Sequence, residues 1–174
     1  MDRKKRIRCM CLSAIFAGIL SVSAWISIPF LGGVSMTLQT LAVALCGYFI
    51  GFTSGAAALG VYILLGIIGI PVFSGFSAGL GILLGPTGGF IYGFFALLML
   101  CSLARRYKGV TAVCLGALGL VICHVCGIIQ YCAVANVEPF SAFTVISLPF
   151  LLKDFISVFA AYVLSKLLRK KIIV

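Results

Sequence analysis

Long apolar stretches, separated only by short turn-forming segments, dominate the pattern of hydrophobic and polar positions. Residues 9–104 form 96 consecutive positions without Asp, Glu, Lys, Arg or His. A helix needs roughly 20 residues to cross a bilayer, so this stretch has room for about four crossings, and two further apolar stretches follow it. The pattern predicts an all-α integral membrane protein, a single domain of six transmembrane helices over residues 9–29, 36–51, 56–70, 86–104, 110–133 and 146–168.

The segment between the third and fourth predicted helices has a different character. Seven glycines lie among residues 69–89, together with Pro71 and Pro86. Proline removes a backbone donor and glycine frees the backbone, so no ordinary helix is expected here. Irregular backbone at membrane depth is tolerated only where it is buried in protein or lines a cavity. We therefore expect a glycine-rich irregular loop that folds back over the protein and forms part of a site.

Composition and charge exclude a soluble protein and a nucleic-acid partner. Only 9% of the residues are charged and 63% are hydrophobic, whereas a soluble domain has about 25% charged residues. The net charge is +10, but 12 of the 13 basic residues lie in clusters within 3–8, 105–108 and 166–171, each flanking an apolar span. Positive charge beside a span marks the cytoplasmic side. We expect a multi-pass protein of the cell membrane, surrounded by lipid, with both termini in the cytoplasm.

A few polar side chains within the spans are candidates for a ligand site. Thr37 and Gln39 open the second span; a threonine there can be a helix cap, but the Gln39 amide needs partners in apolar surroundings. Lys153 and Asp154 lie near the start of the last span. Adjacent helical positions point about 100° apart, so these two need not face each other. Lysine can snorkel to the interface and aspartate cannot reach far, so we interpret Asp154 as an inward-facing acceptor for a ligand.

Metal, cofactor and ATPase sites are not indicated. His124, the chain's one histidine, lies between Cys123 and Cys126. Zinc usually takes four ligands, often as two such pairs, and no second pair is present, so we interpret this stretch as core packing. No Gly-x4-Gly-Lys-Ser/Thr motif is present, so we expect no ATPase site and no cofactor in this chain.

The first span carries small residues on one face. Ala14 and Gly18 lie four positions apart, a spacing that lets another helix approach closely. Packing within the chain explains this feature, and so does the docking of a partner subunit.

Several of these stretches together resemble the BioY family, the biotin-specific substrate-binding subunits of energy-coupling-factor (ECF) transporters. They are Ile28-Pro29, residues 37–43, residues 69–73, residues 79–90, and Pro149-Phe150 with Asp154. The resemblance covers roughly residues 14–168. It implies six helices, a ligand site near the outer face, no catalysis, and transport that needs a membrane coupling subunit and a pair of cytoplasmic ATPases. It also implies that the patch with Ala14 and Gly18 docks on the coupling subunit.

The resemblance makes biotin the expected ligand. Biotin carries a ureido ring with N–H donors, a thioether ring and a carboxylate tail, and a buried Asp154 can accept from a ureido N–H. The other candidate ligand-binding residues are polar groups, aromatic groups and one glycine of the irregular segment: Thr37, Gln39, Ser77, Phe73, Phe76, Tyr92 and Gly79. The family pattern Asp-x-x-Lys has Ser157 at the lysine position here, so Lys153 is the candidate substitute for binding the carboxylate.

Two other classes of protein stay open on the sequence. A self-contained carrier for another vitamin-like ligand usually shows an internal repeat and discontinuous helices in both halves, and this chain shows one irregular segment and no repeat. An intramembrane enzyme needs a convergent set of acids, a Ser-His pair or a metal site. The spans and outer loops offer one Asp, one Glu and one His, far apart in the sequence.

The charge pattern predicts the topology. Reporter fusions after Lys108 and at the C-terminus should read cytoplasmic, and a fusion near Asn136 should read external, because the basic clusters flank the cytoplasmic ends of the spans. An external C-terminus would contradict the six-span topology.

Overall fold

The computed structural model describes residues 3–30 and 34–172 of the chain. Four helical segments are long and apolar enough to cross a membrane, running over Arg3–Trp25, Gly88–Arg106, Val110–Ala135 and Pro139–Lys171. They comprise α1 (Arg3–Trp25), α5 (Gly88–Leu103) with the turn η3 (Ala104–Arg106), α6 (Val110–Ala135), and α7 (Pro139–Ala142), which continues through the π-helical turn η4 (Phe143–Ser147) into α8 (Leu148–Ile172). The expectation of a mostly helical membrane protein is therefore confirmed.

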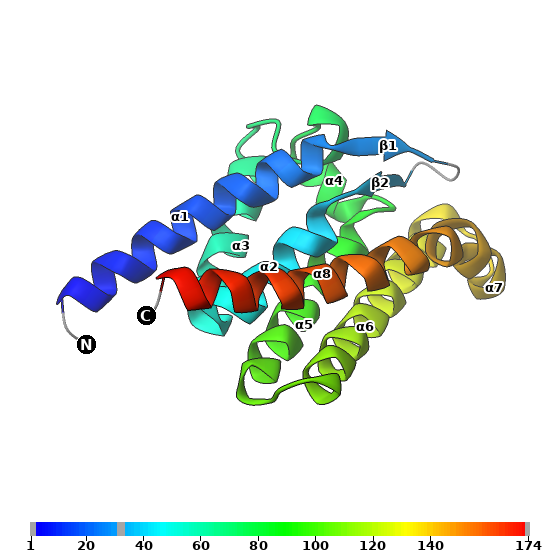
Figure 1. The fold of residues 1–174 in the computed structure, drawn as a ribbon. Helices are drawn as coiled ribbons and strands as arrows, with labels where there is room; N and C mark the ends of the chain where they lie inside the picture. Colours follow the sequence, from blue (N-terminus) through cyan, green and yellow to red (C-terminus); the bar gives the residue numbers. More distant parts are fainter. Residues whose placement is uncertain (1–2, 31–33, 173–174) are drawn as a thin grey trace.

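Two shorter apolar helices, α2 (Gln39–Ile50) and α3 (Phe52–Ile67), lie between these segments. At 1.5 Å per residue, the 12 residues of α2 extend about 18 Å, less than the roughly 30 Å of a bilayer's apolar core. Helix α2 is nevertheless the centre of the bundle, because it packs against α1, α5 and α8. Figure 1 shows it enclosed by these helices.

A β-hairpin precedes α2, which corrects the purely helical prediction. Strand β1 (Ser27–Pro29) pairs antiparallel with β2 (Ser35–Thr37), with Ile28 opposite Met36. Pro29 cannot continue a helix, and the pairing satisfies backbone groups that would otherwise be unpaired at the end of α1. The predicted second span therefore begins as a strand, and its helix starts only at Gln39.

The glycine-rich segment between α3 and α5 is partly helical. It contains the 3₁₀ turn η2 (Ser74–Phe76) and the short helix α4 (Leu80–Leu84). Gly75 and Gly79 have positive φ angles of 66° and 99°, which glycine adopts without the steric cost that other residues incur. These reversals fold the segment back on itself, so that Phe73 bridges to Ser77 and the Gly79 N–H donates to the Gly66 carbonyl.

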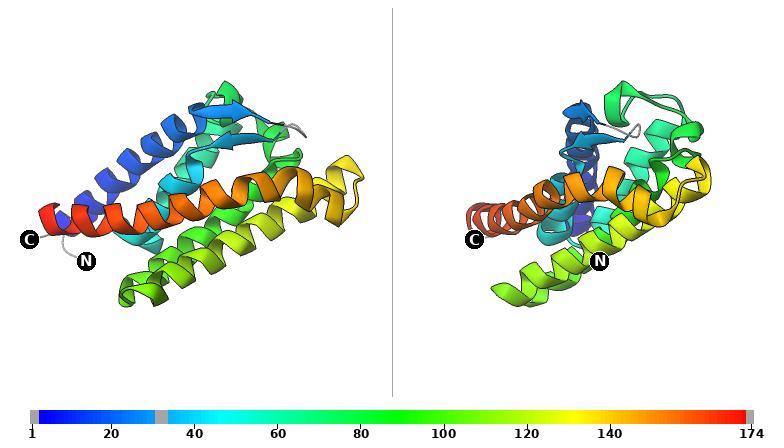
Figure 2. Two further views of the ribbon diagram at one scale, coloured as in Figure 1. Left: turned by 45° about the vertical axis from the view of Figure 1, so that its right-hand side comes forward. Right: turned by 90° about the vertical axis from the view of Figure 1, so that its right-hand side faces the viewer.

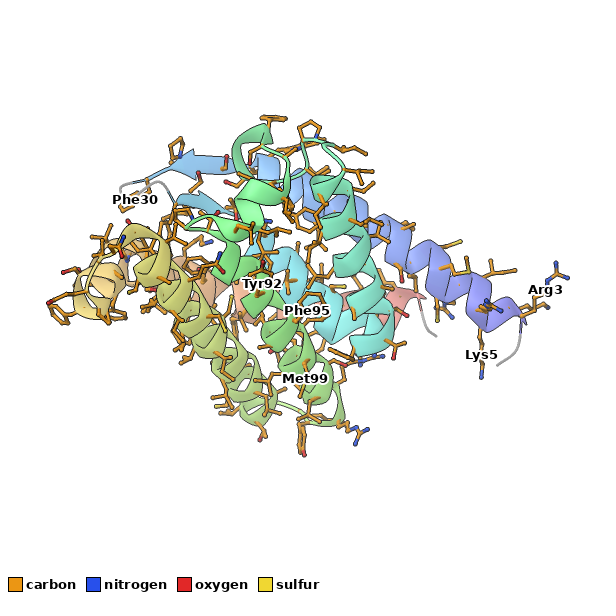
Figure 3. The ribbon with its side chains drawn as sticks, turned by 180° about the vertical axis from the view of Figure 1, so that it is seen from behind. Arg3, Lys5, Phe30, Tyr92, Phe95 and Met99 are labelled. Atoms are coloured by element: carbon orange, nitrogen blue, oxygen red, sulfur yellow. The ribbon has the colours of Figure 1, made fainter. Side chains whose placement is uncertain are left out.

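The described termini share one end of the molecule. The start of α1 and the end of α8 both lie at the end opposite the hairpin and α7 (Figure 1), although Figure 2 shows that the two termini are apart from each other. Side chains of Arg3 and Lys5 project outward from the free end of α1 (Figure 3). The molecule thus has a basic end and, across the bundle, a hairpin end.

Candidate ligand-binding site

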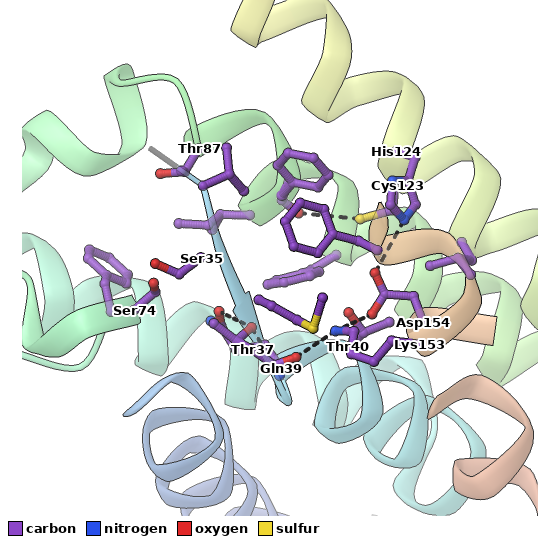
Figure 4. Close-up of a pocket in the computed structure, with 18 of the residues that line it drawn as sticks. Ser35, Thr37, Gln39, Thr40, Ser74, Thr87, Cys123, His124, Lys153 and Asp154 are labelled. Carbon is purple, nitrogen blue, oxygen red and sulfur yellow. Dashed lines mark hydrogen bonds and ion pairs between the residues drawn. The ribbon is translucent and has the colours of Figure 1, made fainter. Parts of the chain in front are cut away.

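A polar cavity lies at the hairpin end, between β2, the start of α2, the glycine-rich segment, α5, α6 and the start of α8 (Figure 4). Its polar lining consists of Ser35, Thr37, Gln39, Thr40, Ser74, Thr87, Cys123, His124, Lys153 and Asp154. Its apolar lining consists of Val34, Met36, Tyr62, Phe73, Ile82, Phe90, Ile91, Phe94, Leu120 and Phe150. Apolar walls with a few convergent polar groups are typical of small-molecule sites.

Asp154 is the buried charge of this cavity. It is 5% exposed, and a carboxylate removed from water is costly unless it is paired and hydrogen-bonded. The Lys153 Nζ lies 2.5 Å from Asp154 Oδ1, and the His124 Nε2 lies 3.3 Å from Asp154 Oδ2. The long lysine stem curls back toward its neighbour, so the two adjacent residues do face each other. Asp154 points into the protein, where its carboxylate faces the cavity (Figure 4).

His124 connects Asp154 to a second polar group. Its Nδ1 lies 3.1 Å from the hydroxyl of Ser147, a fully buried residue of η4. A carboxylate only accepts hydrogen bonds, so Nε2 carries a proton and donates to Asp154, while Ser147 donates to Nδ1 when the ring is neutral. Ser147 thereby fixes the ring orientation, and His124 positions one carboxylate oxygen of Asp154.

Lys153 also links α8 to the hairpin. Its ammonium donates to the Thr37 carbonyl at 2.6 Å as well as pairing with Asp154. The hydroxyl of Thr37 donates to the Gln39 side-chain carbonyl at 3.0 Å, and the Gln39 amide nitrogen donates to the Tyr62 hydroxyl at 2.6 Å. The buried Gln39 amide therefore has the partners that its surroundings require. This chain of contacts runs from α8 through β2 and α2 to α3.

Five of the predicted ligand-binding residues line the cavity, namely Thr37, Gln39, Phe73, Lys153 and Asp154. Phe73 is fully buried and packs edge-on against Tyr62, with ring centroids 5.5 Å apart. Phe90 packs edge-on against His124 at 5.6 Å. Aromatic rings therefore form the wall beside the polar groups, and such rings can enclose an apolar ring system.

The structure does not bring the other four, Phe76, Ser77, Gly79 and Tyr92, into the cavity lining. Phe76 has a φ angle of 58° that turns it outward, where it is 63% exposed and stacks on Trp25. The Ser77 hydroxyl donates to the Ser74 carbonyl, and Gly79 precedes α4. Tyr92 lies about 200° around the helix from Phe90, on the outer face with Phe95 and Met99 (Figure 3).

Sequence reasoning missed His124 and Thr40. Each lies in an apolar helix far from Asp154 in the sequence, and no repeating spacing connects either residue to Asp154. An ionisable residue within a membrane span is nevertheless a functional candidate by default. The Asp and His that are far apart in the sequence are thus neighbours in space. No group of three metal-ligating side chains is found in the described residues.

Ala14 and Gly18 of α1 face away from the bundle. Ala14 is exposed, and a Cβ placed at Gly18 would meet nothing within 4 Å. The core-facing side of this helix instead carries Phe16, Ala17 and Leu20. The surface around Ala14 and Gly18 is therefore open for another helix.

The fold and the cavity together define a multi-pass membrane protein with a buried polar site at one end of an apolar helix bundle. Residues 1–173 match the model of the BioY family, and the chain belongs to that family.

Individual relatives agree with this assignment. A probable biotin transporter BioY of Pyrococcus horikoshii is 34% identical over 160 residues, 91% of this chain and 94% of that protein. The biotin transporter BioY of Thermotoga maritima is 46% identical over 88 residues, which span about half of each protein, 51% of this chain and 52% of the relative. A crystal structure of the S-component for biotin from an ECF-type ABC transporter has the same fold, with a TM-score of 0.87 over 98% of this chain and 95% of that one, at 22% identity.

Proposed function

We propose that this chain is a biotin-binding membrane subunit of an ECF-type transporter and serves in biotin uptake. The observation that carries the proposal is the buried, inward-facing carboxylate of Asp154 inside a cavity of apolar helices. Evidence from relatives supports the ligand, because the family members named above are called biotin transporters. The role is binding and transport without catalysis.

The chemistry of the cavity suits biotin. The ureido ring offers N–H donors, and the carboxylate of Asp154 accepts hydrogen bonds at both oxygens. His124 already holds Oδ2, so a ureido N–H takes the place of Lys153 at Oδ1. The hydroxyl and amide groups of Thr37 and Gln39 lie beside this position, and the rings of Phe73 and Phe90 line the wall for the bicyclic body.

Lys153 is the ammonium that lines the cavity, and we assign the biotin carboxylate to it. Ser157, at the position of the family's lysine, donates to the Lys153 carbonyl and is not in the cavity lining. The ureido ring and the carboxylate lie at opposite ends of biotin, so Lys153 must turn from Asp154 toward the tail. Its flexible stem permits this turn, and its side chain is 26% exposed.

The transport assembly completes the proposal. The six apolar helices α1, α2, α3, α5, α6 and α8 correspond to six membrane segments, with both termini in the cytoplasm and the cavity near the outer face. Energy comes from partner subunits, a membrane coupling subunit and two ATPases, because the sequence has no phosphate-cradling motif. The open surface at Ala14 and Gly18 on α1 is the docking face for the coupling subunit.

Replacing Asp154 tests the ligand assignment. Asp154→Ala should weaken equilibrium binding of labelled biotin to the purified, detergent-solubilised chain by about ten- to a hundredfold or more, since a hydrogen bond to a charged group contributes roughly 1.5–3 kcal/mol. Asp154→Asn keeps the side-chain shape and should also weaken binding. Glu138→Gln removes the exposed outer carboxylate and should change nothing. Wild-type affinity in both Asp154 variants would show that the ureido ring binds elsewhere.

Lys153 is tested with a ligand that lacks the charge. The wild-type chain should bind biotin more tightly than biotin amide, because the ammonium attracts the carboxylate of biotin and not the neutral amide. Lys153→Ala should lose this preference while still binding biotin amide. An unchanged preference in Lys153→Ala would assign the carboxylate to another group.

Docking is tested on α1 by a bulky side chain. Gly18→Trp should abolish biotin uptake in cells that also produce the coupling subunit and the ATPases, because the ring keeps two helices apart. Binding of biotin to the isolated subunit should remain. Gly60→Trp is the matched control, since Gly60 of α3 also faces open space, and should leave uptake intact. If Gly18→Trp weakened binding as much as uptake, α1 would act in folding and not in docking.

A further inference from the structure

A second hollow lies at the basic end of the molecule, across the bundle from the Asp154 cavity. It opens where α1, the α2–α3 junction and η3 meet, and it is lined by Arg8, Cys9, Leu12, Phe49, Ile50, Ser54 and Arg105. Nothing in the proposed binding of biotin uses these residues. The proposed binding of biotin therefore does not account for this hollow.

The two arginines of this hollow lack acidic partners within residues 3–30 and 34–172. The ion pairs found there both involve Asp154, at the other end of the bundle. Nearby Arg169 differs, because its guanidinium donates to the Tyr48 carbonyl. The guanidinium groups of Arg8 and Arg105 are planar, and their donor pattern matches two oxygens of a phosphate group.

The backbone beside the hollow leaves room for the Arg105 side chain. Gly51, which joins α2 to α3, has a φ angle of 89°, and a Cβ built on it would meet the Arg105 guanidinium. The glycine thus leaves room for that group against the α2–α3 junction. Ser54, in the first turn of α3, adds a hydroxyl donor at the same place.

The remaining wall is apolar. Leu12, Phe49 and Ile50 line the hollow, and the adjoining face of α1 continues with exposed Ile15 and Ile19. A free phosphate ion gains nothing from such a wall, whereas a phospholipid places its phosphate on the cations and its acyl chains on the apolar surface. Basic pockets between membrane helices are known to bind anionic lipid headgroups.

We propose that this hollow binds the headgroup phosphate of an anionic phospholipid, with Arg8 and Arg105 as its ligands. The lipid then fills the junction of α1 with the α2–α3 turn and fixes the basic end of the protein in the headgroup layer. The site is independent of biotin binding, so it stands or falls separately from the proposed function.

Native mass spectrometry of the purified full-length chain in detergent tests the proposal. Phosphatidylglycerol should bind and phosphatidylcholine with the same acyl chains should not. Arg8→Gln and Arg105→Gln should each lower the affinity for phosphatidylglycerol by about tenfold or more. Arg3→Gln and Lys170→Gln remove the same charge at the same end, outside the hollow, and should lower it by roughly fivefold at most, the effect of a single charge near an anionic surface.

Four outcomes would overturn the lipid site. Equal losses in the hollow and control variants would mean diffuse attraction, and equal binding of phosphatidylcholine would remove the role of headgroup charge. Inorganic phosphate that competes as well as the lipid would make this an ion site. Wild-type lipid binding in the Arg8→Gln, Arg105→Gln double variant, with loss of co-purifying coupling subunit, would make the hollow a protein contact.

Discussion

Burying one carboxylate among apolar helices is the constraint on which the hairpin end of this protein depends. Asp154 is 5% exposed, so its carboxylate has to be paired and hydrogen-bonded, and its partners come from different elements. Lys153 supplies the charge and reaches on to the Thr37 carbonyl, which holds β2 against α8. His124 supplies the second contact from α6, and its own orientation depends on Ser147. The carboxylate of Asp154 thereby faces the cavity while side chains of α6 and α8 hold it.

The helical part of the fold could be predicted because the lipid around an apolar chain requires the backbone groups to be paired within the protein. A stretch of 96 residues without charge favours membrane-embedded helices, because each helix pairs its backbone groups within itself. The exceptions arise where pairing in space decides the structure. Residues 35–37 have a composition that fits the start of a helix, and only the partner strand at 27–29 makes them a strand. The short helical turns of the glycine-rich segment likewise follow from contacts of individual backbone groups, such as the Gly79 N–H with the Gly66 carbonyl.

The candidate site could be predicted only where a single polar residue is unusual in its apolar surroundings. Asp154 and Gln39 are costly in apolar surroundings, and both line the cavity. The direction in which a side chain points was harder to predict than the residue types that line the cavity. Phe73 points inward and Phe76 outward because Gly75 and Phe76 have positive φ angles, a property that the residue types do not reveal. His124 lies 30 positions before Asp154, and only the packing of α6 against α8 brings the two side chains together.

In the proposed complex the Asp154 carboxylate receives the ureido group of biotin, and the small number of aspartates in the chain allows this contact to be observed directly. Asp2 and Asp154 are the two aspartates of the sequence. In an Asp2→Asn background, ¹³C-labelled aspartate therefore marks Asp154 alone. The ¹³C carboxylate resonance of this chain, recorded in detergent with and without biotin, should shift on saturation with biotin, because a ureido N–H replaces the Lys153 ammonium at Oδ1. Saturating biotin that binds and leaves the resonance unmoved would contradict the assignment.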